Sequence, residues 1–272
     1  MKAAVIGSPI SHSLSPYLHR AAYQDLGLEH TYSAIEVDQS SFLEFIAACN
    51  QEWLGLSLTM PLKEIAFSAV TEVSKTAKLT GSINTITFGS TAKGDNTDVF
   101  GVAQSLRLSG ASNPKTATVI GAGATARSSI AALAGLGAQE VIVIARNQEK
   151  SASCIDLGNE LGITLDTATT AIDILLSTDV VINTTPAGVA DDFSNLLSVA
   201  RGTLLEVIYN PWPTKLATAW QAKSLTVVPG YEMLLHQAVR QVELMTGQIP
   251  NVDVMRTAML AELSVRGITP IS

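Results

Sequence analysis

Polar side chains gather in four short segments of the first hundred residues, and their types could hold an oxygen-rich molecule. Ser11-His12-Ser13-Leu14-Ser15-Pro16 offers three hydroxyls, and Thr59-Met60-Pro61-Leu62-Lys63 adds a hydroxyl and an ammonium group. Amides and carboxylates follow in Gly81-Ser82-Ile83-Asn84-Thr85 and Gly94-Asp95-Asn96-Thr97-Asp98. Each segment alone is also an ordinary turn, because Ser, Asn, Asp and Gly favour turns for local reasons. Taken alone, Lys63 would be read as a solvated surface lysine.

A glycine-rich segment in the second half has the chemistry of a phosphate-binding loop. Val119-Ile120-Gly121-Ala122-Gly123-Ala124-Thr125-Ala126 lies between a predicted strand and an alanine-rich predicted helix. Gly121 permits a tight turn, Gly123 lets the backbone approach a pyrophosphate, and Ala126 permits close helix packing. The N–H groups and positive dipole end of the helix then face the phosphates. A purely structural turn is the alternative, but the flanking strand and helix favour a dinucleotide site.

The end of the next predicted strand indicates which dinucleotide. NAD sites usually place Asp or Glu there, as an acceptor for the ribose 2′-hydroxyl. This chain instead has Ala145-Arg146-Asn147-Gln148-Glu149-Lys150, with cations at Arg146 and Lys150. A guanidinium group binds a 2′-phosphate with two hydrogen bonds and can stack on adenine. The alternative is an ordinary solvated strand end, but the pattern favours NADP over NAD.

These residues must be positioned by an alternation of strands and helices, which indicates an α/β fold. A linker-like stretch at Ser109–Lys115 interrupts the pattern, and we place a domain boundary near residue 100. The predicted strands are Ala3–Ile6, Thr31–Val37, Gly55–Leu58, Ile83–Phe88, Thr116–Ile120, Glu140–Ala145, Val180–Ile182, Leu204–Ile208 and Leu225–Val228. The predicted helices are Ser15–Leu26 with Ser15 as N-cap, one through Phe42, one after Pro61, Asp98–Leu108, Ala124–Leu136, Gln148–Leu161, and two between Tyr231 and Arg266.

Composition limits the classes of protein. The 272 residues are 47% hydrophobic and 15% charged, which excludes disorder as the main state. A net charge of −7 argues against a nucleic-acid-binding surface. No apolar run is long enough to span a bilayer, and the N-terminus lacks the pattern of a signal peptide. Cys49 and Cys154 form neither a metal-ligand spacing nor a disulfide framework, so we expect free thiols, no metal and a cytoplasmic protein.

The segments taken together resemble the shikimate dehydrogenase family over almost the whole chain. The motifs lie in the order of that family: Ser13–Pro16, Thr59–Lys63, Gly81–Thr85, Asn96–Asp98, Asn183–Pro186, Tyr209–Pro211 with Thr214, and Gly230–Gln237. Two departures are Ser57, where the family often has Asn, and Glu206, where it often has Asp. The resemblance implies a reversible, NADPH-dependent reduction of 3-dehydroshikimate to shikimate.

The resemblance also implies the site residues. Lys63 and Asp98 would be catalytic, with Lys63 as the proton donor. The substrate carboxylate would bind Ser13 and Ser15 near Tyr209, and the ring hydroxyls would bind Thr59, Lys63, Asn84, Asp98 and Gln237. NADP would contact Gly121, Ala122, Gly123, Ala124, Thr125, Ala126, Arg146, Asn147, Lys150, Thr184, Thr185, Pro186, Ile208, Gly230 and Met233.

The expected architecture has two α/β domains. Residues 1–100 and 232–272 would form a substrate-binding domain to which the C-terminal helices return, and residues 101–231 a doubly wound, Rossmann-type NADP domain. We expect a small-molecule substrate, no nucleic-acid or membrane partner, and a monomer or homodimer. Two alternatives stay open: a quinate/shikimate dehydrogenase that uses NAD, and a non-catalytic relative that only binds a ligand.

Overall fold

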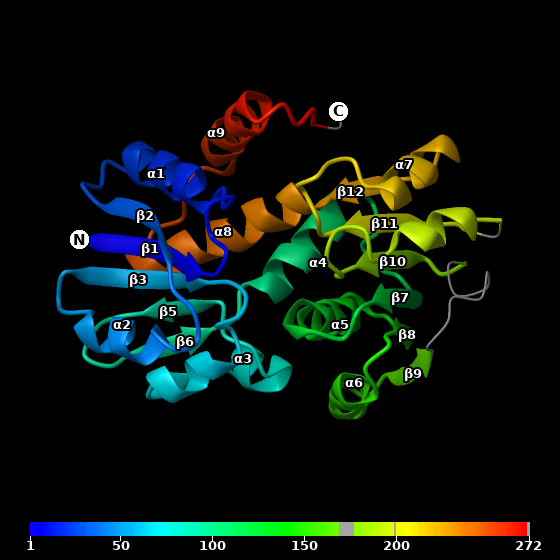
Figure 1. The fold of residues 1–272 in the computed structure, drawn as a ribbon, viewed down its shortest axis with the longest axis horizontal. Helices are drawn as coiled ribbons and strands as arrows, with labels where there is room; N and C mark the ends of the chain where they lie inside the picture. Colours follow the sequence, from blue (N-terminus) through cyan, green and yellow to red (C-terminus); the bar gives the residue numbers. More distant parts are fainter. Residues whose placement is uncertain (169–176, 199, 271–272) are drawn as a thin grey trace. The chain divides into compact units, whose positions relative to one another are not determined.

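The computed structural model describes residues 1–168, 177–198 and 200–270. The chain forms two compact units (Figure 1). Unit 1 comprises Met1–Asp98 and Leu234–Pro270, and unit 2 comprises Val99–Met233. The predicted mixed α/β fold is confirmed. The assignment of substrate to residues 1–100 and 232–272, and of dinucleotide to residues 101–231, remains a prediction.

Unit 1 contains a mixed six-stranded sheet in the order β2-β1-β3-β5-β6-β4. Strand β1 pairs in parallel with β2 and β3, whereas β5 runs antiparallel to both β3 and β6. The register places Ser57 opposite Thr85 and Thr85 opposite Asp95. The residues after β3, before β5 and after β6 therefore meet at one edge of the sheet. The bounds are β1 Lys2–Gly7, β2 Thr31–Glu36, β3 Trp53–Leu58, β4 Glu72–Val73, β5 Thr85–Thr87 and β6 Lys93–Asp95.

Helices cover the sheet of unit 1. Helices α1 and α9 lie side by side over one face, and α2 and α3 lie over the other (Figure 1). A buried cluster that includes Phe42, Leu56 and Ile86 fills the space beneath α2. The bounds are α1 Ser15–Asp25, α2 Phe42–Ala48, η1 Ile65–Ala69, α3 Lys75–Thr80, α8 Gly230–Thr246, which enters unit 1 at Leu234, and α9 Val252–Val265.

Two local predictions in unit 1 were wrong. The first helix begins at Ser15 after Leu14, so Ser15 is not the N-cap. The hydroxyl of Ser13 instead accepts the Ser15 backbone N–H at 3.2 Å. The segment after Pro61 forms only a short 3₁₀ helix from Ile65, and α3 and β6 were not predicted. Such short elements carry too little periodicity to be identified from sequence.

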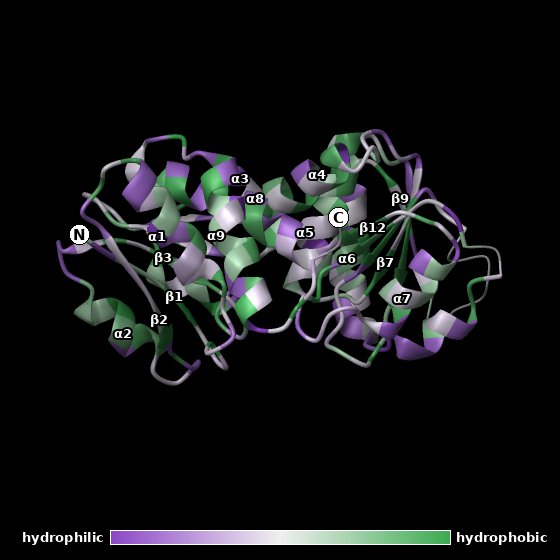
Figure 2. Cartoon of the chain, turned by 90° about the horizontal axis from the view of Figure 1, so that it is seen from above, coloured by the Kyte–Doolittle hydropathy of each residue, from purple (hydrophilic) through white to green (hydrophobic). Residues whose placement is uncertain are grey.

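Unit 2 contains six parallel strands in the order β12-β11-β10-β7-β8-β9, which is the Rossmann order 3-2-1-4-5-6 read from the other end. Strands β10 and β11 are buried along their whole length, as is usual in a parallel sheet covered on both faces. The apolar strands around β7 and β12 appear in green in Figure 2. The bounds are β7 Thr116–Ile120, β8 Glu140–Ile144, β9 Thr164–Ala168, β10 Val180–Asn183, β11 Thr203–Glu206 and β12 Val227–Pro229.

The helices of unit 2 follow from right-handed crossovers between parallel strands. The crossovers place α5 and α6 on one face of the sheet and α7 on the other (Figure 1). The fully buried Trp220 of α7 donates from its indole N–H to the Gly202 carbonyl at 3.2 Å. The bounds are α4 Asp98–Leu108, α5 Ala124–Leu136, α6 Gln148–Leu161, η3 Asp191–Asn195 and α7 Lys215–Ala222.

Two further sequence expectations concern membranes and cysteines. Among the helices of residues 1–168, 177–198 and 200–270, none has the length and apolarity that a membrane span requires. Cys49 and Cys154 are both free thiols, and Cys154 is buried.

The buried His19 of α1 gives unit 1 a pH-dependent stability. Its ring stacks on Tyr32 with 4.0 Å between centroids, and its Nε2 lies 3.3 Å from Gln241 Oε1. Burial lowers the pKa of His19 to about 3, and the bond to Gln241 opposes that shift only in part. Because the Gln241 carbonyl oxygen can only accept, the neutral ring donates its Nε2 hydrogen to it.

We expect the free energy of unfolding to decrease as pH falls from 6.5 towards 3. In that window the unfolded state binds a proton that native His19 does not, so the slope approaches about 1.4 kcal/mol per pH unit. His19→Phe keeps a ring on Tyr32 and should show a weaker pH dependence than the wild type. Urea unfolding of both proteins at pH 7 and pH 5 measures this, and equal pH dependence in the two would contradict it.

Candidate active site

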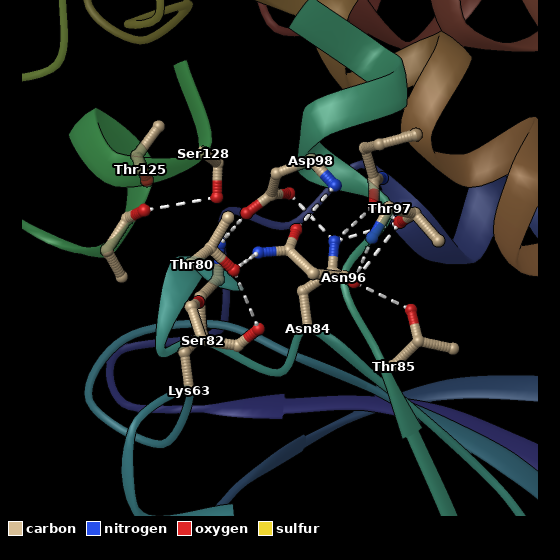
Figure 3. Close-up of polar contacts among 12 residues, drawn as sticks. Lys63, Thr80, Ser82, Asn84, Thr85, Asn96, Thr97, Asp98, Thr125 and Ser128 are labelled. Carbon is tan, nitrogen blue, oxygen red and sulfur yellow. Dashed lines mark hydrogen bonds and ion pairs between the residues drawn. The ribbon is translucent and has the colours of Figure 1, made fainter. Parts of the chain in front are cut away.

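The shared sheet edge of unit 1 brings Lys63 and Asp98 into direct contact. Lys63 follows β3, and Asp98 follows β6 as the first residue of α4. Lys63 Nζ lies 2.6 Å from Asp98 Oδ2, and the two side chains are only 15% and 6% exposed (Figure 3). The two predicted catalytic residues therefore form a largely buried ion pair.

Asn84 holds the other oxygen of that carboxylate. Its Nδ2 donates to Asp98 Oδ1 at 2.8 Å and to Thr97 Oγ1 at 2.9 Å, and its Oδ1 accepts the Thr97 backbone N–H at 2.8 Å. Asn84 is buried, and these contacts join the start of β5 to the end of β6 (Figure 3). Asn84 thus fixes the position of Asp98, in addition to any contact with a ligand.

The cluster extends to residues far away in the sequence. Gln237 of α8 accepts a hydrogen bond at its Oε1 from Thr97 Oγ1 at 3.3 Å, and the same oxygen lies 3.4 Å from Asn84 Nδ2. The Asp98 backbone N–H donates to Asn96 Oδ1 at 2.9 Å. The predicted residues Lys63, Asn84, Asp98 and Gln237 are therefore brought together. An ammonium group among amides, hydroxyls and a carboxylate suits proton exchange with a hydroxylated ligand.

Thr59 lies in the turn that connects β3 to Lys63. Its backbone N–H donates to the Ile6 carbonyl at 3.0 Å, and its carbonyl accepts the Leu62 N–H at 2.9 Å. A Cβ added at Gly7 would overlap the Thr59 methyl group, so Gly7 allows the end of β1 to approach this turn. Thr59 is half-buried at the same edge of the sheet.

The loop with Ser13 and Ser15 is anchored by a residue that the sequence analysis missed. Arg266, directly after α9, donates from Nη1 to the His12 carbonyl at 2.7 Å and lies 5.6 Å from the centre of the Tyr17 ring. Its Nε is 2.7 Å from Glu262 Oε1. No local motif marks Arg266, because it is 254 residues from its partner in the loop.

In unit 2 the glycine loop meets the Thr184 segment at the carboxyl ends of β7 and β10, where the strand order reverses. Gly121 has φ of +107°, and a Cβ there would overlap Thr184 Oγ1. The Thr184 hydroxyl donates to the Ile120 carbonyl at 2.8 Å. In contrast, a Cβ at Gly123 would meet no atom within 4 Å, so the N-terminal end of α5 is open to a ligand. A reversal point of this kind is where doubly wound sheets bind dinucleotides.

A buried carboxyl group connects two of the sequence motifs. Asn183 Nδ2 donates to both oxygens of Glu206, at 2.9 and 3.0 Å, and Thr214 Oγ1 donates to Oε2 at 2.8 Å. Asn183 Oδ1 in turn accepts from the Thr185 N–H and hydroxyl. Burial raises the pKa of Glu206, and these donors oppose the shift. Glu206 therefore links the 183–186 segment to the segment before α7.

The tip of β8 presents the predicted phosphate-binding cations. Arg146 and Lys150 are exposed, and no carboxylate occupies positions 145–148. Asn147 is the N-cap of α6, because its Oδ1 accepts the Lys150 backbone N–H at 2.9 Å. The residues at this tip fit a dinucleotide that carries an extra phosphate.

The remaining predicted residues of unit 2 lie between β11 and the start of α8. Ile208 and Tyr209 follow β11, and Met233 is buried in α8. A Cβ at Gly230 would overlap the Val207 carbonyl group, so glycine lets the chain pass close to the end of β11. Within the described part of the chain, no group of His, Cys, Asp and Glu side chains could hold a metal ion.

Comparison with known proteins identifies the family. Residues 5–86 match the shikimate dehydrogenase substrate-binding domain, residues 104–189 match the shikimate/quinate 5-dehydrogenase domain, and residues 230–260 match the shikimate 5′-dehydrogenase C-terminal domain. The shikimate dehydrogenase (NADP(+)) of Methanothrix thermoacetophila is 35% identical over 267 residues, which cover 96% of this chain and 97% of the relative.

Solved structures agree. The shikimate dehydrogenase of Mycobacterium tuberculosis has a TM-score of 0.89 at 38% identity, covering 96% of this chain and 99% of that one. The Thermus thermophilus shikimate 5-dehydrogenase, solved with NADP(H) and shikimate, has a TM-score of 0.84 at 28% identity, covering 96% and 99%. The resemblance seen in the motifs is thereby confirmed, and the chain belongs to the shikimate dehydrogenase family.

Proposed function

We propose that the protein catalyses the reversible NADPH-dependent reduction of 3-dehydroshikimate to shikimate. The observation that carries the proposal is the Lys63–Asp98 ion pair, which is held by Asn84 and surrounded by hydroxyl and amide groups. A non-catalytic ligand-binding relative would not need a buried ammonium–carboxylate pair, which is costly to remove from water.

In the proposed reaction the residues of unit 1 bind the substrate and move the proton. The Lys63 ammonium group donates a proton to the oxygen of the ring ketone during reduction, and the neutral amine that this step leaves accepts a proton from the hydroxyl in the reverse direction. Asp98 holds the ammonium group in place. Thr59 and Gln237 bind ring hydroxyls, and Asn84 does so if its bond to Thr97 yields to the substrate. Ser13 and Ser15 bind the carboxylate, together with Tyr209 of unit 2.

The residues of unit 2 hold the dinucleotide, which supplies the hydride when bound. The pyrophosphate binds Gly121, Ala122 and Gly123 and the first turn of α5, at Ala124, Thr125 and Ala126. Arg146 and Lys150, with Asn147, bind the 2′-phosphate of NADP. Thr184, Thr185, Pro186, Ile208, Gly230 and Met233 line the remainder of the proposed cofactor site.

We further propose a cytoplasmic location and a monomeric or homodimeric state, without nucleic-acid or membrane partners. The two free thiols support the cytoplasmic location. The excess of 24 Asp and Glu residues over 17 Lys and Arg residues supports the absence of nucleic-acid and membrane partners. Light scattering of the purified protein would measure its oligomeric state.

The direct test is a spectrophotometric assay of the purified chain with shikimate or quinate, crossed with NADP or NAD. We expect the greatest kcat/KM with shikimate and NADP, because Arg146 stands at the strand tip where an NAD enzyme usually has a carboxylate. Turnover with quinate and NAD above that with shikimate and NADP would contradict the proposal, as would no turnover with any pair.

Lys63→Ala should lower kcat by about 10²- to 10⁴-fold, the usual contribution of a positioned acid or base, while NADP binding persists. Lys2→Ala is a matched control, because Lys2 also pairs with a carboxylate of unit 1, at 2.7 Å from Glu52, but on the surface. Steady-state kinetics and fluorescence titration with NADPH measure the two effects. A Lys63→Ala enzyme with wild-type kcat would eliminate the proposed role of Lys63.

Arg146→Ala should weaken NADP binding by about 1.5–3 kcal/mol, the value of a hydrogen bond to a charged group, and leave NAD binding nearly unchanged. The control is Arg107→Ala, which removes an exposed arginine at the end of α4 in the same unit. The KM values for NADP and NAD in each variant measure the selectivity. Equal increases for both dinucleotides would mean that Arg146 does not read the 2′-phosphate.

A further inference from the structure

A buried series of polar side chains lies beneath the Asn84–Asp98 contact and has no place in the proposed reaction. At its centre is Gln241 of α8, which is 1% exposed. Its Nε2 donates to the Asn84 carbonyl at 3.1 Å and to Thr85 Oγ1 at 3.0 Å. Its Oε1 accepts from Ser57 Oγ at 2.8 Å and from His19 Nε2 at 3.3 Å. Both amide hydrogens and both carbonyl lone pairs are therefore engaged.

The Asn84 backbone carbonyl fixes which way the Gln241 amide points, because a carbonyl oxygen can only accept. The nitrogen must face Asn84, so the oxygen must face Ser57. That oxygen cannot donate, so the Ser57 hydroxyl gives its hydrogen to Gln241. The Tyr32 hydroxyl, 2.6 Å from Ser57 Oγ, must then donate to Ser57. Burial raises the pKa of Tyr32, so its hydroxyl keeps the hydrogen that it donates.

The same direction of hydrogen-bond donation continues from Gln241 towards Asp98. Because Thr85 Oγ1 accepts from Gln241, its own hydrogen is available for Asn84 Oδ1, which lies at 2.8 Å. The Thr97 backbone N–H also donates to Asn84 Oδ1, and a backbone N–H cannot accept. The carbonyl oxygen of the Asn84 amide is thus fixed on two sides, and its nitrogen faces Asp98. In every hydrogen bond of the series that leads from Tyr32 to Asp98, the donor is therefore the group nearer to Tyr32.

We propose that Gln241 is a positioning residue of the active site, acting through Thr85 and Asn84 to hold Asp98 against Lys63. Only an amide supplies the two donors and the acceptor that this direction requires. Gln241 is 1% exposed and therefore has no surface free to contact a substrate or a dinucleotide, and its identification rests on the function proposed above. We call Tyr32, Ser57, Gln241, Thr85 and Asn84 the Gln241 relay.

The relay is confined to one of the two units. All of its members belong to unit 1, so its loss should affect the substrate and not the dinucleotide.

The test compares Gln241→Met, Thr85→Val and Thr85→Ser by steady-state kinetics with shikimate and NADP. Gln241→Met and Thr85→Val should each lower kcat/KM for shikimate by about tenfold or more, because a buried polar partner is left unpaired. The KM for NADP should stay within about twofold of the wild type. Thr85→Ser keeps the hydroxyl and should restore most of the activity that Thr85→Val loses.

The matched control is Thr246→Val. It removes a hydroxyl that bonds only to backbone groups at the end of the same helix, at Val242 and Gln248. Thermal unfolding of every variant separates a folding defect from loss of position, because a purely structural defect lowers the amount of active enzyme and leaves KM unchanged for both substrates.

The outcomes distinguish this inference from the proposed function. A wild type that does not turn over shikimate refutes the function. A wild type that is active, with Gln241→Met and Thr85→Val at wild-type kcat/KM for shikimate, overturns the relay alone. An equal loss of kcat/KM for shikimate in Thr85→Ser and Thr85→Val also overturns it. Equal increases in the KM values for shikimate and NADP in Gln241→Met or Thr85→Val do so as well.

Discussion

The ion pair between Lys63 and Asp98 is the constraint on which unit 1 depends. Removing two charges from water is costly, and their attraction offsets that cost only when the geometry is good and the remaining lone pairs are bonded. The second oxygen of Asp98 accepts from Asn84, and the backbone N–H of Asp98 donates to Asn96. The sheet register supplies the geometry, since Ser57, Thr85 and Asp95 lie side by side on adjacent strands.

Unit 2 handles charge in a different way. Its glycine loop offers backbone N–H groups and a helix end, and its cations at Arg146 and Lys150 are exposed at a strand tip. The buried carboxyl group of Glu206 faces amide and hydroxyl donors from Asn183 and Thr214. One unit therefore holds a compact ion pair suited to proton transfer, and the other presents donors suited to phosphates.

The sequence could predict what is local. The Gly121–Ala126 loop, the alternation of strands and helices in unit 2, and the segments that contain Lys63, Asn84 and Asp98 all carry short-range signals. Their assembly into one site could be inferred only from the family resemblance, because Gln237 and Asn84 are 153 residues apart.

The residues that hold the site in position could not be predicted in the same way. Arg266 and Gln241 contact loops of the proposed substrate site through long-range hydrogen bonds, and neither lies in a motif that indicates this contact. Gln241 on an amphipathic helix resembles any polar helical residue, and its partner, the Asn84 carbonyl, is 157 residues away in the sequence. The short elements η1, α3 and β6 were not predicted for a related reason. Contacts with neighbouring strands and turns stabilise them, and their sequences are too short to show a periodic pattern.

The central claim is that unit 1 holds the substrate site ready, with the ion pair already formed. Isothermal titration calorimetry of the full chain with shikimate, in the absence of any dinucleotide, tests this most directly. The account predicts saturable binding at one site by the wild type, and loss of that heat in Asp98→Ala. Binding of shikimate only after NADP is added, or equal binding by Asp98→Ala, would contradict it.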